Sequence, residues 1–118
     1  MDNPYARWAG IIRAAAYERV ATLDRRLAMP SPDAVFFPEA LNAVLWSEGV
    51  WDRMNADQGT HLDIAEEEDL SPSQSGALAT HLEMASHGLA PADALIVRQA
   101  VVLLRRASRS AEWTIVAM

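Results

Sequence analysis

Residues 61 to 70, with the sequence HLDIAEEEDL, form the densest group of side chains in this protein that could do chemistry. Imidazole and carboxylate groups bind metal ions and exchange protons, and an acidic run can also bind a basic partner or simply lie in solvent. These three roles need different geometry, so the spacing of the residues separates them. The six groups are His61, Asp63, Glu66, Glu67, Glu68 and Asp69.

A metal site requires side chains that converge on one point, and consecutive residues do not converge. On a helix, neighbouring side chains point about 100° apart, and on a strand they alternate between faces. At most two of Glu66, Glu67 and Glu68 could therefore reach one ion. The metal alternative, a small hydrolase or oxidoreductase, relies on His61, Asp63 and Glu67, with His81 as a further ligand.

Other catalytic patterns are absent from the sequence. His81 and His87 are six positions apart, about 240° around a helix, so they do not share a face as the histidines of a zinc-binding H-E-x-x-H motif do. There are no cysteines, which excludes disulfides, thiolate zinc sites and cysteine nucleophiles. There is also no nucleophile elbow and no glycine-rich phosphate loop. We therefore expect a non-enzymatic protein without a cofactor.

The net charge of −6 is unevenly distributed along the chain. Residues 31–93 carry one arginine and twelve acids, whereas residues 94–118 carry four arginines and one acid. Five of these acids lie in residues 63–69, which are called the acidic segment below. Either the acidic segment pairs with Arg98, Arg105 and Arg109 of the same chain, or it faces a basic protein. A pI near 4.9 argues against nucleic-acid binding.

Apolar periodicity predicts that helices position these groups. We expect one amphipathic helix over residues 1–28, a second over 38–56, a third ending near 87 and a fourth over 90–109. Thr60 and Asp63 would form a capping pair that places the acids in a first helical turn. The predicted fold is an all-α, compact bundle of four to five helices in a single domain, residues 1–118, with residues 112–118 as a docked tail or a lone strand.

The predicted helix 38–56 is apolar on more than one side. Trp46, Leu41 and Leu45 fall beside charged positions, so either other helices cover this side or it is an interface with a partner or a second copy. Buried tryptophan often dominates interface energy. The predicted partner-binding residues are Trp46, Leu41, Leu45, Asp63, Glu66, Glu67, Glu68 and Asp69.

These observations predict a small protein-binding module of the inhibitor, immunity, anti-defence or adaptor type, whose acidic surface meets a basic protein partner. The alternative is a structural subunit of a larger assembly or a homo-oligomer such as a dimer, and the third hypothesis is the metal-dependent enzyme. The N-terminus lacks a signal-peptide pattern, and there is no apolar run long enough to span a membrane. We therefore expect a cytoplasmic protein without membrane contact.

Overall fold

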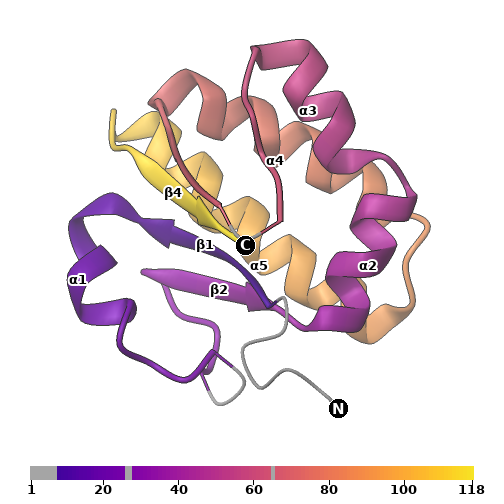
Figure 1. The fold of residues 1–118 in the computed structure, drawn as a ribbon, viewed down its shortest axis with the longest axis horizontal. Coiled ribbons are helices and arrows are strands. Elements are labelled where there is room, and N and C mark those ends of the chain that lie inside the picture. Colours follow the sequence, from indigo (N-terminus) through magenta and orange to yellow (C-terminus); the bar gives the residue numbers. More distant parts are fainter. Residues whose placement is uncertain (1–7, 26–27, 65) are drawn as a thin grey trace.

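The computed structural model describes residues 8–25, 28–64 and 66–118. An antiparallel sheet with strand order β2-β1-β4-β3 lies at its centre, and helices pack against both faces (Figure 1). The elements in chain order are β1 (Ala9–Arg13), a 3-10 helix (Ala14–Ala16), α1 (Tyr17–Val20), β2 (Ala34–Phe37), α2 (Glu39–Ser47), α3 (Val50–Gln58), β3 (Glu67–Leu70), α4 (Pro72–Ser86), α5 (Pro91–Arg109) and β4 (Thr114–Ala117).

The prediction of an all-α bundle is wrong, and the first error lies in the predicted helix 1–28. Strand β1 and the short α1 occupy this region, while residues 1–7 and 26–27 lie outside the described part. Ile11 and Ile12 point to opposite faces of the sheet, and both are buried. A strand covered on both faces has a nearly continuous apolar run, which a helical period fits equally well.

The second error lies at residues 112–118, which form an inner strand rather than a tail or a lone strand. Strand β4 pairs with β1 on one side and with β3 on the other. Its Thr114 hydroxyl lies 2.8 Å from the Ser75 hydroxyl of α4, and both residues are buried. This polar contact fixes β4 against the helical layer.

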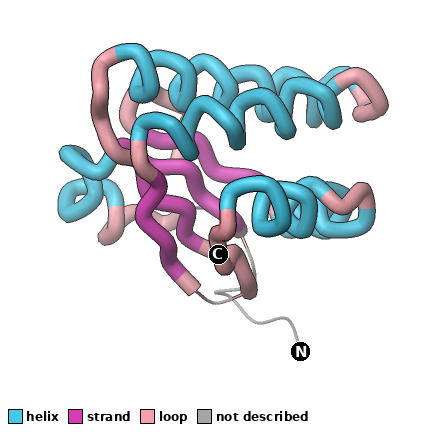
Figure 2. The backbone as a smooth tube through the Cα atoms, turned by 90° about the horizontal axis from the view of Figure 1, so that it is seen from above, coloured by secondary structure: helices cyan, strands magenta, loops and turns pink. Residues whose placement is uncertain are grey.

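Each face of the sheet has its own apolar core. On one face, Ile12 and Phe36 pack with Ala16 and Val20 around α1 and form the smaller core, which is called the minor core below. Gly10 is required here, because a Cβ at this position would lie 2.6 Å from two ring carbons of Phe36. On the other face, α4 and α5 lie against the sheet (Figure 2), and side chains of α2 and α3 complete the larger core, which is called the main core below. The largest fully buried side chains include Trp51, Phe37, Ile11, Leu41, Leu45 and Leu104.

The predicted helix 38–56 is two helices, α2 and α3. Gly49 breaks it with a φ of 76°, a left-handed conformation that favours glycine. Gly59, with a φ of 67°, caps the C-terminal end of α3. The Nε1 of Trp51 donates to Asn42 Oδ1 at 3.0 Å, so a buried hydrogen bond joins the two helices.

Helices α4 and α5 agree with the predicted third and fourth helices. Ser71 and Gln74 form a capping box at the start of α4, and proline occupies the first turn of both helices. Figure 1 shows α4 and α5 behind the sheet, where α5 crosses the strands. Among the described residues, no helix combines the length and apolar character needed to cross a membrane.

Candidate functional site

The acidic segment forms a loop and the edge strand β3, not the first turn of a helix. Thr60 and Asp63 therefore do not form the predicted helix cap. Instead, Thr60 Oγ1 donates to Asn55 Oδ1 at 2.8 Å, and the Leu62 backbone N–H donates to the same oxygen at 2.8 Å. Asn55 Nδ2 donates to the Leu62 carbonyl at 3.0 Å. Helix α3 thus holds the loop that leads into β3.

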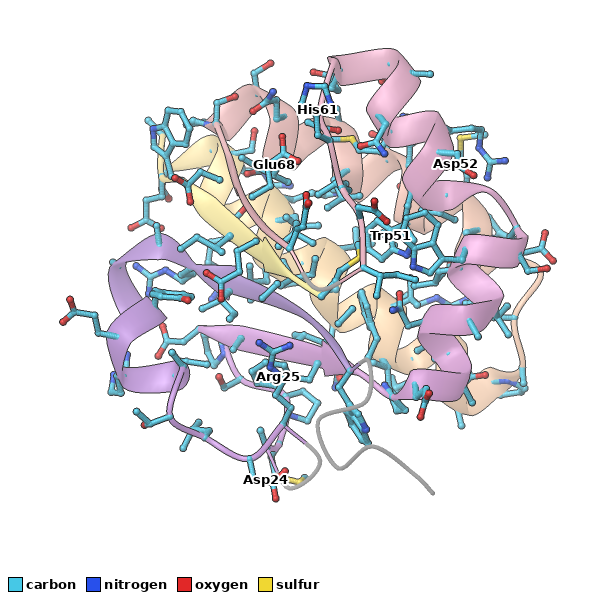
Figure 3. All side chains as sticks on the ribbon, in the orientation of Figure 1. Asp24, Arg25, Trp51, Asp52, His61 and Glu68 are labelled. Atoms are coloured by element: carbon cyan, nitrogen blue, oxygen red, sulfur yellow. The ribbon has the colours of Figure 1, made fainter. Side chains whose placement is uncertain are left out.

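Strand β3 distributes its carboxylates over both faces of the sheet edge. Leu70 is buried in the main core, so Glu68 two positions earlier lies on the same face. Glu68 Oε2 accepts the His61 backbone N–H at 2.8 Å, and Figure 3 labels both residues. Glu67 and Asp69 lie on the opposite face, next to α1.

Tyr17 of α1 contacts the acidic strand directly. Its hydroxyl donates to Glu67 at 2.6 Å from Oε1 and 2.5 Å from Oε2. This hydrogen bond to Glu67 raises the pKa of Tyr17 above its ordinary value of 10.0, because the phenol proton is retained in the bond. Glu66 and Asp69 are exposed, and neither side chain has a hydrogen bond within the described ranges.

The arginines of the C-terminal half do not pair with the acidic segment. Arg105 pairs with Glu83 instead, joining α5 to α4. No ion pair links Arg98 or Arg109 to residues 63–69 in the part of the chain that the structure describes. Asp63 and residues 66–69 have no cationic partner among the described residues, so their mutual repulsion is not neutralised there.

Arginines near the N-terminus pair with other acids. Arg13 contacts Asp33 Oδ1 and Glu112 Oε1, each at 2.8 Å, and Arg19 contacts Asp33 Oδ2 at 3.0 Å. The hydrogen bond from Arg19, followed by that from Arg13, lowers the pKa of Asp33 below its ordinary value of 3.8. These pairs join the start of β2 to β1 and to the segment before β4. They use acids outside the acidic segment.

The hypothetical metal ligands are not brought together. Glu67 is bound by Tyr17 on one face of β3, while the loop with His61 is held through Glu68 on the other. His81 pairs with Asp57, at 3.0 Å between Nε2 and Oδ2. No group of three histidine or acidic side chains within the described ranges could hold a metal ion.

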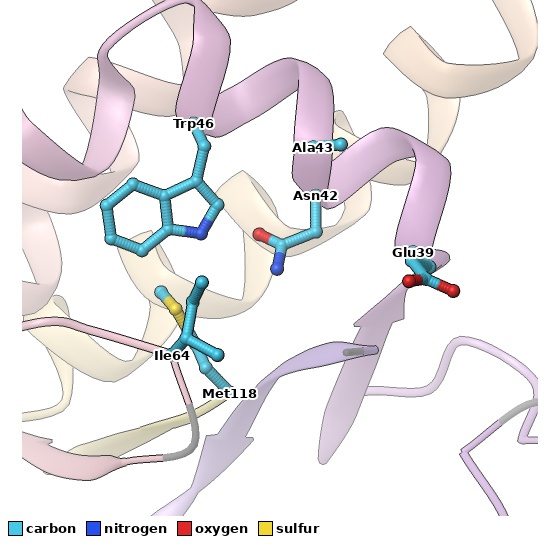
Figure 4. A pocket seen from close by; sticks show the side chains of 6 residues that line it. All are labelled: Glu39, Asn42, Ala43, Trp46, Ile64 and Met118. Atoms are coloured by element: carbon cyan, nitrogen blue, oxygen red, sulfur yellow. The ribbon is translucent and has the colours of Figure 1, made fainter. Parts of the chain in front are cut away.

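Trp46 lies half-buried beside a small pocket of about 120 Å³ (Figure 4). Its ring packs against the main core, and the centroids of the Trp46 and Trp51 rings are 6.4 Å apart. Unlike Trp51, its Nε1 is buried without a hydrogen-bond partner among the described residues. A buried donor without a partner costs about 1–3 kcal/mol. The pocket is lined by Glu39, Asn42, Ala43, Trp46, Ile64 and Met118.

The other two apolar residues predicted to bind a partner lie in the core. Leu41 is 1% exposed and Leu45 is 0% exposed, because other elements cover this side of α2. Ile64, which is 47% exposed, and Met118 also line the pocket, although neither is among the predicted partner-binding residues. Ile64 has a local signal, since it interrupts an acidic stretch. Met118 has none, because only the sheet brings it to the pocket.

The pocket adjoins the acidic segment. Ile64 lies between Asp63 and Glu66 in sequence, and the Met118 backbone N–H donates to the Glu66 carbonyl at 3.0 Å. Glu39 adds a further carboxylate to the pocket lining. One surface therefore combines an acidic edge strand with an apolar hollow.

Comparison with known proteins gives a likeness of fold. No family model matches the chain, and no curated protein matches it in sequence. A solved structure titled "Neisseria DNA mimic protein DMP12" is similar, with a TM-score of 0.67 and 12% sequence identity. The match covers 95% of this chain and 100% of that chain. At this identity, the likeness establishes a shared fold only.

Proposed function

We propose that this protein is a non-enzymatic binding module whose acidic edge occupies the DNA-binding surface of a basic, DNA-binding protein. One observation carries the proposal. Asp63 and residues 66–69 place five carboxylates on one loop and edge strand, with no cationic partner in the described part of the chain. Such a row of uncompensated charge favours a partner with complementary cations.

The spacing of these carboxylates suits a protein that recognises DNA. Along a β-strand, successive residues advance about 3.3 Å. The phosphates of one DNA strand advance about 3.4 Å along the helix axis. Counted over both faces of the strand, residues 66–69 therefore present negative charge at an axial density close to that of a single DNA strand, and each face carries about half of it. Lysine and arginine side chains that contact consecutive phosphates could contact these carboxylates instead.

The fold supports the same class of partner. The similar Neisseria structure is named a DNA mimic, and a mimic of DNA meets proteins that recognise DNA. Among the described strands of this chain, only β4 pairs with β3, so the outer edge of β3 faces away from those strands. An acidic edge of this kind would accelerate association with a basic groove and make binding sensitive to salt.

A capture and competition experiment tests the proposal. Proteins of the native cell that bind DNA-cellulose are offered to the immobilised chain, and each captured protein is purified. We expect the chain to displace a fluorescent DNA duplex from that protein. Captured proteins that keep their duplex in the presence of excess chain would contradict the proposal.

A pair of matched variants then tests the acidic edge. Glu66→Gln/Asp69→Asn removes two exposed carboxylates from the site. Glu48→Gln/Asp52→Asn makes the same change of charge at the α2–α3 turn, and Figure 3 places Asp52 away from Glu68. We expect the first variant to lose about five- to tenfold in affinity at low salt and the second about twofold at most. Equal losses would show that only net charge matters.

A further inference from the structure

We propose that the Trp46 pocket receives an apolar side chain of the basic partner, and that an adjoining peptide carbonyl accepts a hydrogen bond from Trp46 Nε1. The identity of the partner rests on the proposed function, whereas the chemistry of the pocket stands on its own geometry. The interface would then have an acidic edge that attracts the partner and an apolar anchor that fixes it.

The indole nitrogen defines the polar part of the ligand. Trp46 Nε1 is buried and has no acceptor among the described residues. The neighbouring amide oxygen, Asn42 Oδ1, already accepts from Trp51 Nε1 at 3.0 Å. A buried N–H without a partner favours any ligand that supplies an acceptor. Every protein partner carries such acceptors as backbone carbonyls.

The walls of the pocket define its apolar part. Figure 4 shows Ile64 and Met118 facing the Trp46 ring, and Ile64 is 47% exposed. Ile64 lies in the loop before β3, and Met118 follows the last residue of β4. These two side chains can move aside to admit an acceptor to the buried nitrogen, since methionine is flexible and neither residue lies within a helix or strand.

Size and charge narrow the ligand further. A pocket of about 120 Å³ is too small for a typical cofactor and suits a single side chain. Glu39 lines it, and the acidic segment flanks it through Ile64 and through the bond between Met118 and Glu66. We therefore assign the ligand as an apolar residue next to an arginine or lysine in the partner.

The test uses a short peptide as the probe. The uniformly ¹⁵N-labelled protein is titrated with N-acetyl-leucyl-arginine amide, and the Trp46 indole signal is identified by its absence in Trp46→Phe. We expect this signal to move downfield and saturate with a Kd on the order of 1 mM. N-acetyl-glycyl-arginine amide lacks the apolar side chain, and N-acetyl-leucyl-glutamate amide has the opposite charge. Both should bind several times more weakly.

Two surface variants complete the test. Ile64→Ser should weaken peptide binding, whereas Val102→Ser, at a residue 57% exposed on α5, should not. An unmoved Trp46 signal, or an equal response to the glycyl peptide, would overturn the proposal. Because the probe is a peptide, this result does not depend on whether a DNA-binding protein is captured. If a DNA-binding protein is captured but the peptide does not move the Trp46 signal, the proposal for the pocket is overturned and the proposed function is not.

Discussion

The Tyr17 hydroxyl donates to both carboxylate oxygens of Glu67, at 2.6 Å from Oε1 and 2.5 Å from Oε2. This contact joins α1 to the acidic edge strand, although the two residues are fifty positions apart. It fixes the direction of one carboxylate, whereas the exposed side chains of Glu66 and Asp69 have no such bond within the described ranges. The acidic edge therefore contains two carboxylates held by hydrogen bonds of the fold, Glu67 by Tyr17 and Glu68 by the His61 backbone N–H, and two, Glu66 and Asp69, that can adapt to a partner.

The titration of Tyr17 should reveal this contact. Its pKa is raised above 10.0 by the hydrogen bond to Glu67, so the bond stabilises the fold fully below pH 10 and is lost as the pH rises through the folded-state pKa. Phenolate absorbance, taken as the difference between the wild type and Tyr17→Phe, measures the midpoint. In Glu67→Gln the midpoint should fall towards 10. An unchanged midpoint would contradict the assignment.

Asp33 should contribute to stability in a pH-dependent way. Arg19 and Arg13 lower its pKa below 3.8, so its contribution is complete above pH 3.8 and is lost as the pH falls through the folded-state pKa. We expect Asp33→Asn to lower the free energy of unfolding by about 1 kcal/mol at pH 7, since the pairs are partly exposed to solvent. Urea unfolding at pH 7 and pH 2 measures this difference. It should be smaller at pH 2 than at pH 7, and Asp69→Asn should show no such difference at either pH.

The two core-facing tryptophans should respond differently to the same substitution. Trp51→Phe breaks the bond to Asn42 and leaves a space in the core, with an expected loss of about 2–4 kcal/mol. Trp46→Phe removes a buried N–H that has no partner among the described residues, so the expected loss is about 1 kcal/mol or less. The urea midpoints of the two variants measure the difference. Equal losses would mean that the Trp46 nitrogen has an acceptor in solution.

Gly10→Ala should destabilise the minor core by overpacking. The new Cβ would lie 2.6 Å from two Phe36 ring carbons, and that ring is 6% exposed with the Arg25 guanidinium 5.8 Å from its centroid. We expect a loss of about 1–3 kcal/mol in the free energy of unfolding. In a double-mutant cycle with Phe36→Leu, the two losses should be less than additive. If the two losses are strictly additive, the strain caused by Gly10→Ala does not arise from the Phe36 ring.

The helices that sequence reasoning found are those with local signals. Ser71 and Gln74 form a capping box that depends only on residues three positions apart, and Gly59 ends α3 through its own backbone preference. Strand β1 lacks such signals, and residues 112–118 indicated only a docked tail or a lone strand, without partners. Ile11 and Ile12 are apolar because both faces of the sheet are covered, and one of the two strands that pair with them lies about a hundred positions later.

The candidate site was accessible from sequence only in part. The composition of residues 63–69 revealed the charge but not the strand, because a run of acids lacks the apolar alternation that indicates a strand. On an edge strand, such charges instead serve to prevent pairing with other chains. The unusual position of Trp46 was visible on the helical projection. The burial of Leu41 and Leu45 was not, because it depends on how α2 packs against the sheet and the other helices.

The place of β4 between β1 and β3 has a consequence for the order of events during synthesis. Strand β1 ends at Arg13 and cannot pair with β4 until residue 117 has left the ribosome. Strand β3 pairs with β4 and with no other described strand. A nascent chain that already contains every carboxylate of residues 63–69 therefore still lacks the sheet that arranges them. Such long-range pairing is formed late and slowly. The acidic edge is therefore a property of the finished fold, because a growing chain contains the acidic residues before it can form the sheet that arranges them.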